Sequence, residues 1–126
     1  MERFSFGEDV AFVPRGDLLE GVRMAPLTQP SEEGALVKAA IFRFAPGGRI
    51  RRHPGTDPQI LAVLEGSGEV SGAGGVDESI GPGEAVFLHQ GEDHELKSEV
   101  GLTVLILEGA SLDRFRGRPT AHSAPG

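Results

Sequence analysis

The chain of 126 residues contains no cysteine, no tryptophan and no tyrosine. Without cysteine there is no disulfide framework, no thiolate nucleophile and no cysteine-based zinc site, so any bound metal must use His, Asp, Glu or Gln. The absence of tyrosine and cysteine also removes two common general acids or bases. Long apolar runs are missing too, because stretches such as 60–64 and 102–107 fall far short of the roughly 20 residues of a membrane-spanning helix. No membrane association is expected.

Positive charge is scarce, since 12 Lys and Arg residues stand against 19 Asp and Glu residues and give a net charge of −7. Binding to nucleic-acid phosphates needs clustered Lys and Arg, so we expect no nucleic-acid partner and favour a small-molecule ligand. The first residues lack the basic segment and apolar stretch of a secretory signal, and we therefore expect a cytoplasmic protein.

Glycine and proline, by contrast, are abundant, and the 19 Gly and 9 Pro residues fall between short apolar stretches. Turn residues that recur at this spacing predict an all-β sandwich or barrel. The expected strands cover residues 36–44, 59–64, 68–71, 78–80, 85–88, 94–98 and 102–107. A turn is expected at 46–48, and the acidic turn at 92–93 is expected to be solvated.

The length predicts a single domain over residues 1–126. We divide it into an N-terminal arm at 1–34, a barrel at 35–108 and a C-terminal tail at 109–126. The arm is apolar enough to pack as an extra strand. In the tail, residues 111–116 are the best helical candidate, and 120–126 are expected to fray.

Two groups of residues in the middle of the chain follow a fixed spacing. They are Gly47, His53, Gln59 and Gly66, followed by Gly83, Gly91 and His94. In this order and without gaps, the two groups resemble the two motifs of the cupin family. The resemblance covers residues 35–108 and implies a double-stranded β-helix, or jelly-roll, barrel.

The resemblance also implies a metal site, because the His and carboxylate positions of the cupin motifs point into the barrel and hold one divalent ion. Here His53, Gln59 and His94 would hold Zn, Ni, Fe or Mn. The motif is incomplete at four positions, which are Gly55, Gln59, His89 and Ser98. Gly55 removes one imidazole and Gln59 removes a negative charge, which favours Lewis-acid chemistry over oxidation.

Other interpretations of these residues remain open. Two buried imidazoles held by hydrogen bonds in a metal-free pocket are the main alternative for His53 and His94. Asp57, between His53 and Gln59, is either a turn residue or the missing anionic ligand. A shifted register would place Arg51 and His53 at the two His positions, and we prefer the ungapped register.

Alternation along the strands assigns directions to the side chains. An inward Gln59 takes residues 61 and 63 inward and leaves 60, 62 and 64 outward. An inward His94 takes Leu96 and Ser98 inward. The outward apolar residues need a cover, and because small cupins are commonly dimers we expect a homodimer.

The same alternation, applied to an inward His53, places Arg51 inward and Arg52 outward. Arg51 is then a candidate to bind a substrate carboxylate, although an ion pair with Glu69 or another acid is an equal alternative. His89 is expected on the surface or at the rim of the pocket.

Two functions of different class follow. The first is a metal-dependent enzyme of the lyase, isomerase or cyclase type that acts on a small anionic or carbonyl compound, with Arg51, Asp57 and His89 as catalytic candidates. The second is a non-catalytic binding or sensing module with a vestigial metal site. The two retained His residues favour the enzyme, whereas Gly55 and Gln59 favour the module.

Overall fold

The computed structural model describes residues 1–29 and 37–117, and within them the chain forms eight antiparallel strands and no helix. The strands are β1 (Leu19–Pro26), β2 (Lys38–Pro54), β3 (Gln59–Gly66), β4 (Gly68–Ser71), β5 (Glu78–Ile80), β6 (Ala85–Leu88), β7 (Asp93–Lys97) and β8 (Leu102–Glu108). The all-β prediction is confirmed. The helix predicted at 111–116 is wrong, and the end of the predicted tail lies outside the described residues. No helix suited to crossing a membrane is found in the described part of the chain.

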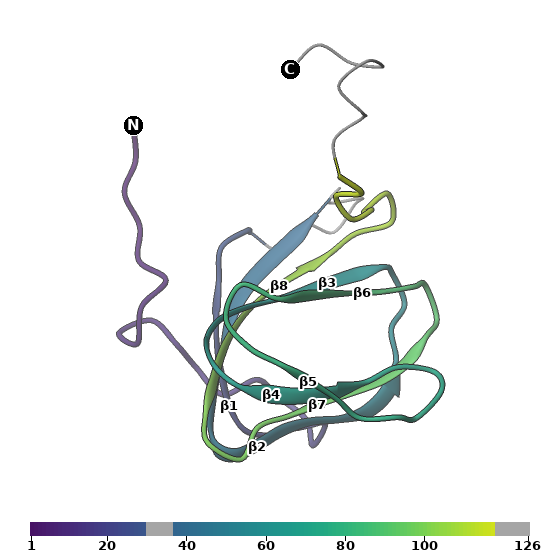
Figure 1. The fold of residues 1–126 in the computed structure, drawn as a ribbon. Coiled ribbons are helices and arrows are strands. Elements are labelled where there is room, and N and C mark those ends of the chain that lie inside the picture. The colour runs from purple at the N-terminus through teal and green to yellow at the C-terminus, as the bar shows by residue number, and fades with distance from the viewer. Residues whose placement is uncertain (30–36, 118–126) are drawn as a thin grey trace.

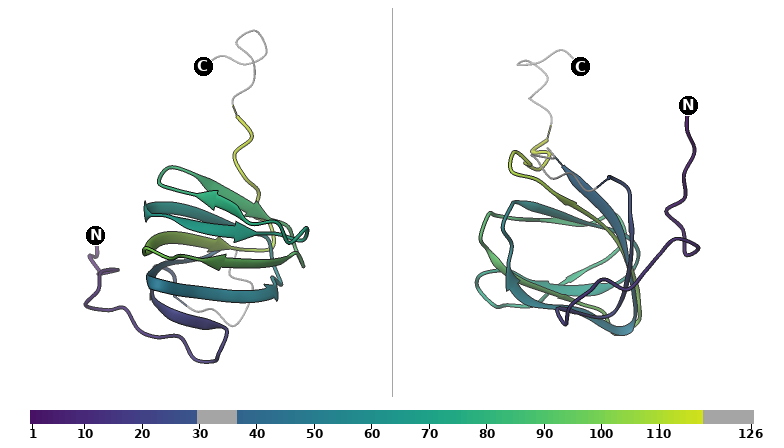
Figure 2. Two further views of the ribbon diagram at one scale, coloured as in Figure 1. Left: turned by 60° about the horizontal axis from the view of Figure 1, so that its bottom comes forward. Right: turned by 180° about the vertical axis from the view of Figure 1, so that it is seen from behind.

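The strands form one sheet that curls into a nearly closed barrel. Their hydrogen-bonded order is β5-β4-β7-β2-β8-β3-β6, and β1 pairs with the other edge of β2. Figure 1 shows β3, β6 and β8 on one side of the barrel and β4, β5 and β7 on the other, with β2 running from one side to the other. The two further views in Figure 2 show the N-terminal segment running outside the barrel. The predicted jelly-roll barrel is confirmed.

The 17-residue strand β2 exchanges partners at a bend. Residues 38–44 pair with β8, whereas 49–54 pair with β7. The turn predicted at 46–48 is therefore wrong, because the chain bends there without leaving the sheet. Gly47 has a φ of 85°, and a Cβ on Gly48 would lie 2.6 Å from the carbonyl oxygen of Gly21 on β1. Glycine permits both the bend and this close approach.

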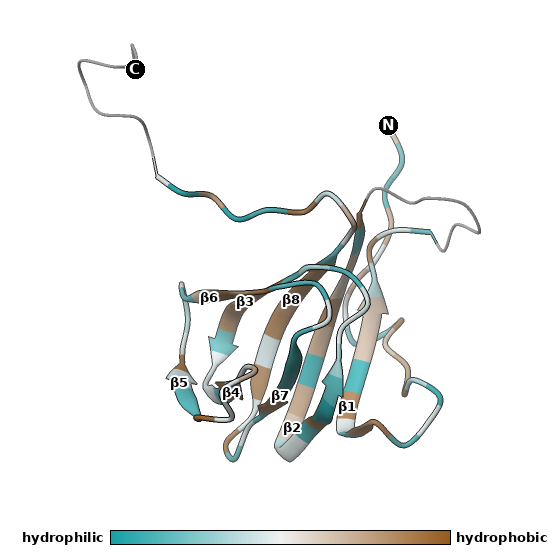
Figure 3. Ribbon diagram, turned by 90° about the vertical axis from the view of Figure 1, so that its right-hand side faces the viewer, coloured by the Kyte–Doolittle hydropathy of each residue, from teal (hydrophilic) through white to brown (hydrophobic). Residues whose placement is uncertain are grey.

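Inward-facing rows of side chains fill the barrel. On β3, Leu61 and Val63 are buried and Leu64 is exposed, as the alternation predicted. The predicted burial of Leu96 on β7, and of Ser98 directly after it, is also confirmed. Figure 3 shows the hydrophobic stretches of β3, β6 and β8 lying together around the core. The apolar pattern therefore sets which face of each strand turns inward.

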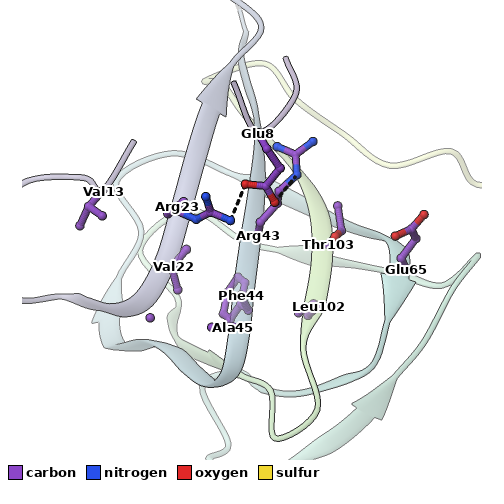
Figure 4. Close-up of a pocket in the computed structure, with 11 residues that line it drawn as sticks. Glu8, Val13, Val22, Arg23, Arg43, Phe44, Ala45, Glu65, Leu102 and Thr103 are labelled. Carbon is purple, nitrogen blue, oxygen red and sulfur yellow. Dashed lines mark ion pairs between the residues drawn. The ribbon is translucent and has the colours of Figure 1, made fainter. Parts of the chain in front are cut away.

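The segment before β1 attaches to the outer face of the barrel at a few points. Phe12 forms a single bridge with Met24 of β1. Glu8 pairs with Arg23 and Arg43, which are cross-strand partners on β1 and β2 (Figure 4). These residues line a hollow of about 520 Å³ that contains no histidine. Part of the predicted arm thus forms an extra strand, β1.

Candidate metal site

Four glycines of the two motifs allow backbone conformations that other residues rarely adopt. Gly47, Gly66, Gly83 and Gly91 all have φ between 75° and 85°, in the left-handed region that other residues rarely adopt. Gly55 has no such φ. The backbone therefore does not require glycine at position 55, and what Gly55 changes is the side-chain content of the site.

His53 and His94 meet across two paired strands. They are cross-strand partners at the end of β2 and the start of β7, and their ring centroids lie 4.4 Å apart with the planes tilted by 59°. His94 is buried and His53 is half-buried. Two side chains that the sequence separates by about 40 residues are thus in contact inside the barrel.

Both rings are oriented by backbone carbonyls. The distance from His53 Nδ1 to the oxygen of Arg51 is 2.7 Å, and that from His94 Nδ1 to the oxygen of Glu92 is 3.0 Å. A carbonyl can only accept, so each Nδ1 carries the hydrogen and each Nε2 keeps its lone pair. This arrangement is typical of histidines that coordinate metals.

Burial favours the neutral form of His94. It lowers the pKa of the His94 imidazole below its usual value of 6.5, against the opposing hydrogen bond to the Glu92 carbonyl. Charge repulsion between the two rings also lowers this pKa, the Glu92 carboxylate raises it, and the positive charge of Arg52 lowers it. His94 is therefore deprotonated at neutral pH, as metal coordination requires.

Gln59 approaches the same point from β3. It is buried, and its Nε2 donates to Oε2 of Glu108 over 3.1 Å. A Cβ built on Gly55 would lie 3.0 Å from Gln59 Nε2 and 3.3 Å from Cε1 of His94. The structure therefore brings Gln59 and His94 together beside Gly55, and His53 lies against His94.

The donors at this point suit a divalent ion bound with reduced affinity. Two imidazole nitrogens are neutral ligands that transition metals accept. Gln59 would coordinate through its amide oxygen, whereas its Nε2 is the atom that faces Gly55 and donates to Glu108. The described residues include no group of three His, Cys, Asp or Glu side chains placed to share a metal. Within those residues, Asp57 therefore does not complete the pair of histidines as an anionic third ligand.

Comparison with known proteins identifies the family. The family model for the cupin domain matches residues 40–108, which is more than half of the chain. The chain belongs to the cupin family. It is 40% identical over 73 residues to (R)-mandelonitrile lyase from Granulicella tundricola, a match that covers 58% of this chain and 55% of the lyase. The chain thus spans about half the length of that curated relative.

Solved structures show the same cupin fold. The polyketide cyclase RemF from Streptomyces resistomycificus superposes with a TM-score of 0.74 at 22% identity, over 99% of this chain and 94% of the cyclase. An RmlC-like cupin from Shewanella frigidimarina gives a TM-score of 0.71 at 22% identity, over 90% and 95% of the two chains. At these identities the likeness establishes the fold alone.

Arg51 does not face the interior of this cupin barrel. The register between β2 and β7 shifts between residues 50 and 53, which breaks the simple alternation. Arg51 is exposed and pairs with Glu20 on β1. The predicted inward direction of Arg51 is therefore wrong, and its alternative as an ion-paired residue is confirmed with Glu20 in place of Glu69.

Arg52 is exposed, like Arg51, so its predicted outward direction is confirmed. Its guanidinium donates to the hydroxyl of buried Ser71 and, over 3.0 Å, to the carbonyl oxygen of Gly72. Its positive charge also acts to lower the pKa of His94, for which burial is the largest cause. Arg52 thus connects the end of β2 to β4 beside the histidine pair.

His89 and Glu92 occupy the turn before β7. His89 is exposed, with its ring edge against Phe87 at a centroid distance of 5.1 Å, which agrees with its predicted surface or rim position. Glu92 is not the solvated residue that was predicted. Its carboxylate accepts the N–H groups of Ala73 and His89, each over 3.0 Å, and these bonds lower the pKa of Glu92. Glu92 therefore connects the turn that contains Ala73 to the turn that contains His89 by hydrogen bonds.

Glu108 is the site residue that sequence analysis missed. It is half-buried and is the cross-strand partner of Gln59. The alternation of Leu102, Val104 and Ile106 would place Glu108 inward if the predicted strand were extended by one residue. Extending the predicted strand to residue 108 would therefore have identified Glu108 as an inward-facing residue.

Proposed function

We propose that this cupin is a metal-dependent lyase that acts on a small carbonyl compound or its adduct. The observation that carries the proposal is the pair of imidazoles, His53 and His94, each with Nδ1 held by a carbonyl and Nε2 left free. Gln59 would supply a third, neutral ligand. A divalent ion bound there would supply Lewis acidity toward a carbonyl or alkoxide oxygen.

The residues of the chain themselves prepare such a site. The carbonyls of Arg51 and Glu92 hold the two rings in the tautomer that coordinates metals, so little reorganisation is needed on binding. The absence of a side chain at Gly55 lets Gln59 and His94 pack closely against this position, where a Cβ would lie 3.0 Å from Gln59 Nε2 and 3.3 Å from Cε1 of His94.

The similarity to (R)-mandelonitrile lyase supports a lyase over an isomerase or cyclase. Mandelonitrile, the cyanohydrin of benzaldehyde, is therefore the first substrate to test. Because the match covers only about half of that lyase, the shared activity belongs to the proposal, whereas membership of the cupin family is established by the family model.

The test combines metal analysis with turnover. Protein purified without an affinity tag should contain a stoichiometric divalent metal and release benzaldehyde from mandelonitrile, followed by absorbance. His53→Ala and His94→Ala should lose the metal, while His89→Ala, a control at an exposed histidine, should retain it. Protein that contains no metal, and whose melting temperature does not rise with Zn, Ni, Fe(II) or Mn, would refute the metal site.

The second candidate function is a binding or sensing module with a vestigial metal site. It is favoured by Gly55, which removes a ligand position, and by the neutral amide of Gln59. This module would bind 1-phenylethanol, a mandelonitrile analogue that lacks the nitrile, with a rise in melting temperature. It would release no benzaldehyde from mandelonitrile in the presence of any of the four metals.

We also propose that two copies associate through the outer face of β3 and β8. Ile60 and Leu107, and Ala62 and Leu105, are outward-facing cross-strand partners that form an apolar surface. Leu107→Glu should convert a dimer into a monomer in sedimentation experiments, and a wild-type monomer would contradict this arrangement. The expected cytoplasmic location stays a prediction.

A further inference from the structure

A hollow of about 350 Å³ lies at the end of the barrel formed by β1, β2 and β8. Its walls are apolar, with Met24, Pro26, Ala40, Phe42 and Ile106 among the lining residues. The charged groups in its lining are Lys38 and Glu108. A pocket with apolar walls and few polar groups is typical of a site for a small organic molecule.

The strand register places this hollow on the inner face of the sheet. Ile106 lies opposite Ala40 on β2 and Leu61 on β3, and Leu61 belongs to the core. Cross-strand partners project to the same side of a sheet. The hollow is therefore continuous with the inward face that carries Gln59.

Glu108 joins the hollow to the candidate metal site. It lies opposite Lys38 on one neighbouring strand and Gln59 on the other. Its Oε2 accepts the amide hydrogen of Gln59, and Glu108 is also one of the residues that line the hollow. An ionised carboxylate offers several further acceptor positions, so Glu108 can also receive a hydrogen bond from a hydroxyl group.

We propose that this hollow binds the aryl or other apolar part of an alcohol or carbonyl compound, and that Glu108 accepts the hydrogen bond of the substrate hydroxyl. The binding claim stands by itself, whereas the following step rests on the proposed lyase function. In mandelonitrile, Glu108 would take the hydroxyl proton while the O–H electron pair forms the carbonyl. The electron pair of the broken C–C bond leaves with cyanide, which then takes the proton from Glu108.

The binding claim is tested with 1-phenylethanol, which has the ring and hydroxyl of mandelonitrile but no cyanide to lose. In a methyl-labelled NMR titration, the signals of Met24, Ala40 and Ile106 should shift most. The signals of Val76 and Val100, which are exposed and outside the lining, should stay in place. Shifts that are absent, or that spread evenly over the methyl groups, would overturn the assignment of the hollow.

The role of Glu108 is tested by Glu108→Gln, which keeps the shape of the side chain and an acceptor for Gln59. Replacing a charged acceptor by a neutral one should weaken binding of 1-phenylethanol about tenfold. Loss of the proton acceptor should lower kcat for mandelonitrile by about 100-fold or more, with metal content unchanged. Glu95→Gln, an outward-facing control on β7, should change none of these values.

The outcomes separate this inference from the proposed function. A wild-type protein that does not cleave mandelonitrile refutes the proposed lyase, while the NMR titration and the affinity of Glu108→Gln still decide the binding site. If Glu108→Gln binds 1-phenylethanol as tightly as the wild type, the role of Glu108 is refuted even where turnover is found. The methyl spectrum of each variant shows that it is folded.

Discussion

The two sides of the candidate site are held in place by different kinds of contact. His53 and His94 are each oriented by a backbone carbonyl two residues earlier in the same segment. Gln59 is oriented by Glu108, which is 49 residues away and reaches it only through the pairing of β3 with β8. The imidazoles therefore depend on local strand geometry, and the amide depends on tertiary register.

The largest expected effect is the loss of metal affinity when either a histidine or Gln59 is replaced. His94→Ala should weaken metal binding by about 100-fold or more, because a strong imidazole ligand is lost. Gln59→Leu should weaken it only about tenfold, since a neutral amide oxygen is a poor ligand. Competition with a chelator gives both affinities. Equal losses would show that His94 and Gln59 contribute equally to metal binding, and would contradict the expected difference between an imidazole and an amide ligand.

Adding an imidazole at position 55 should raise metal affinity, which is the opposite of the effect of removing a histidine. In Gly55→His, the new side chain would start beside both Gln59 and His94, and we expect metal affinity to rise about tenfold or more. The Cβ fits if the Gln59 amide moves by a few tenths of an ångström. Gly55→Ala is the matched control, because it adds the Cβ without a ligand. A metal affinity that rises equally in both variants would contradict the ligand assignment.

The histidine side should also respond to pH in the metal-free protein. Because the pKa of His94 is lowered below 6.5 in the folded state, the unfolded chain binds the proton more readily. Stability should therefore be full above about pH 6.5 and fall as the pH drops below that value. Urea unfolding of wild type and His94→Gln between about pH 5 and pH 7.5 measures this. If the unfolding free energy of His94→Gln depends on pH as steeply as that of the wild type, another group causes the acid sensitivity.

The smallest effects concern the two arginines before His53. Arg51→Ala removes an exposed ion pair with Glu20 and should cost less than about 0.5 kcal/mol of unfolding free energy. Arg52→Ala removes hydrogen bonds to Ser71 and Gly72 and should cost about 1 kcal/mol or more. Thermal unfolding compares the two variants. A larger loss of unfolding free energy for Arg51→Ala would contradict the greater contribution expected from the hydrogen bonds of Arg52.

Much of the barrel could be predicted from the sequence because local rules govern it. The glycines of the motifs occupy left-handed positions that few other residues tolerate, so their spacing marks the bend in β2 at Gly47 and the turns at Gly66, Gly83 and Gly91. Alternation correctly turned Gln59, Leu61 and His94 inward because their strands are regular. These residues are predictable since each depends on neighbours close in sequence.

The errors occur where partners far along the chain decide the geometry. The register shift near His53 leaves both Arg51 and Arg52 exposed, whereas alternation predicted an inward Arg51. Glu92 resembles a solvated turn residue until Ala73 is brought beside it. Glu108 gains its place at the site only from its pairing with β3.

The long strand β2 has a further consequence for how the chain tolerates change. It supplies Lys38 and Ala40 to the hollow and His53 to the imidazole pair, on opposite sides of the bend at Gly47. The distance between these groups is therefore set by a count of residues along one strand. Insertions in the loop after β4 should be absorbed at little cost, whereas one residue inserted near Gly47 should rotate His53 out of the barrel while leaving the hollow intact.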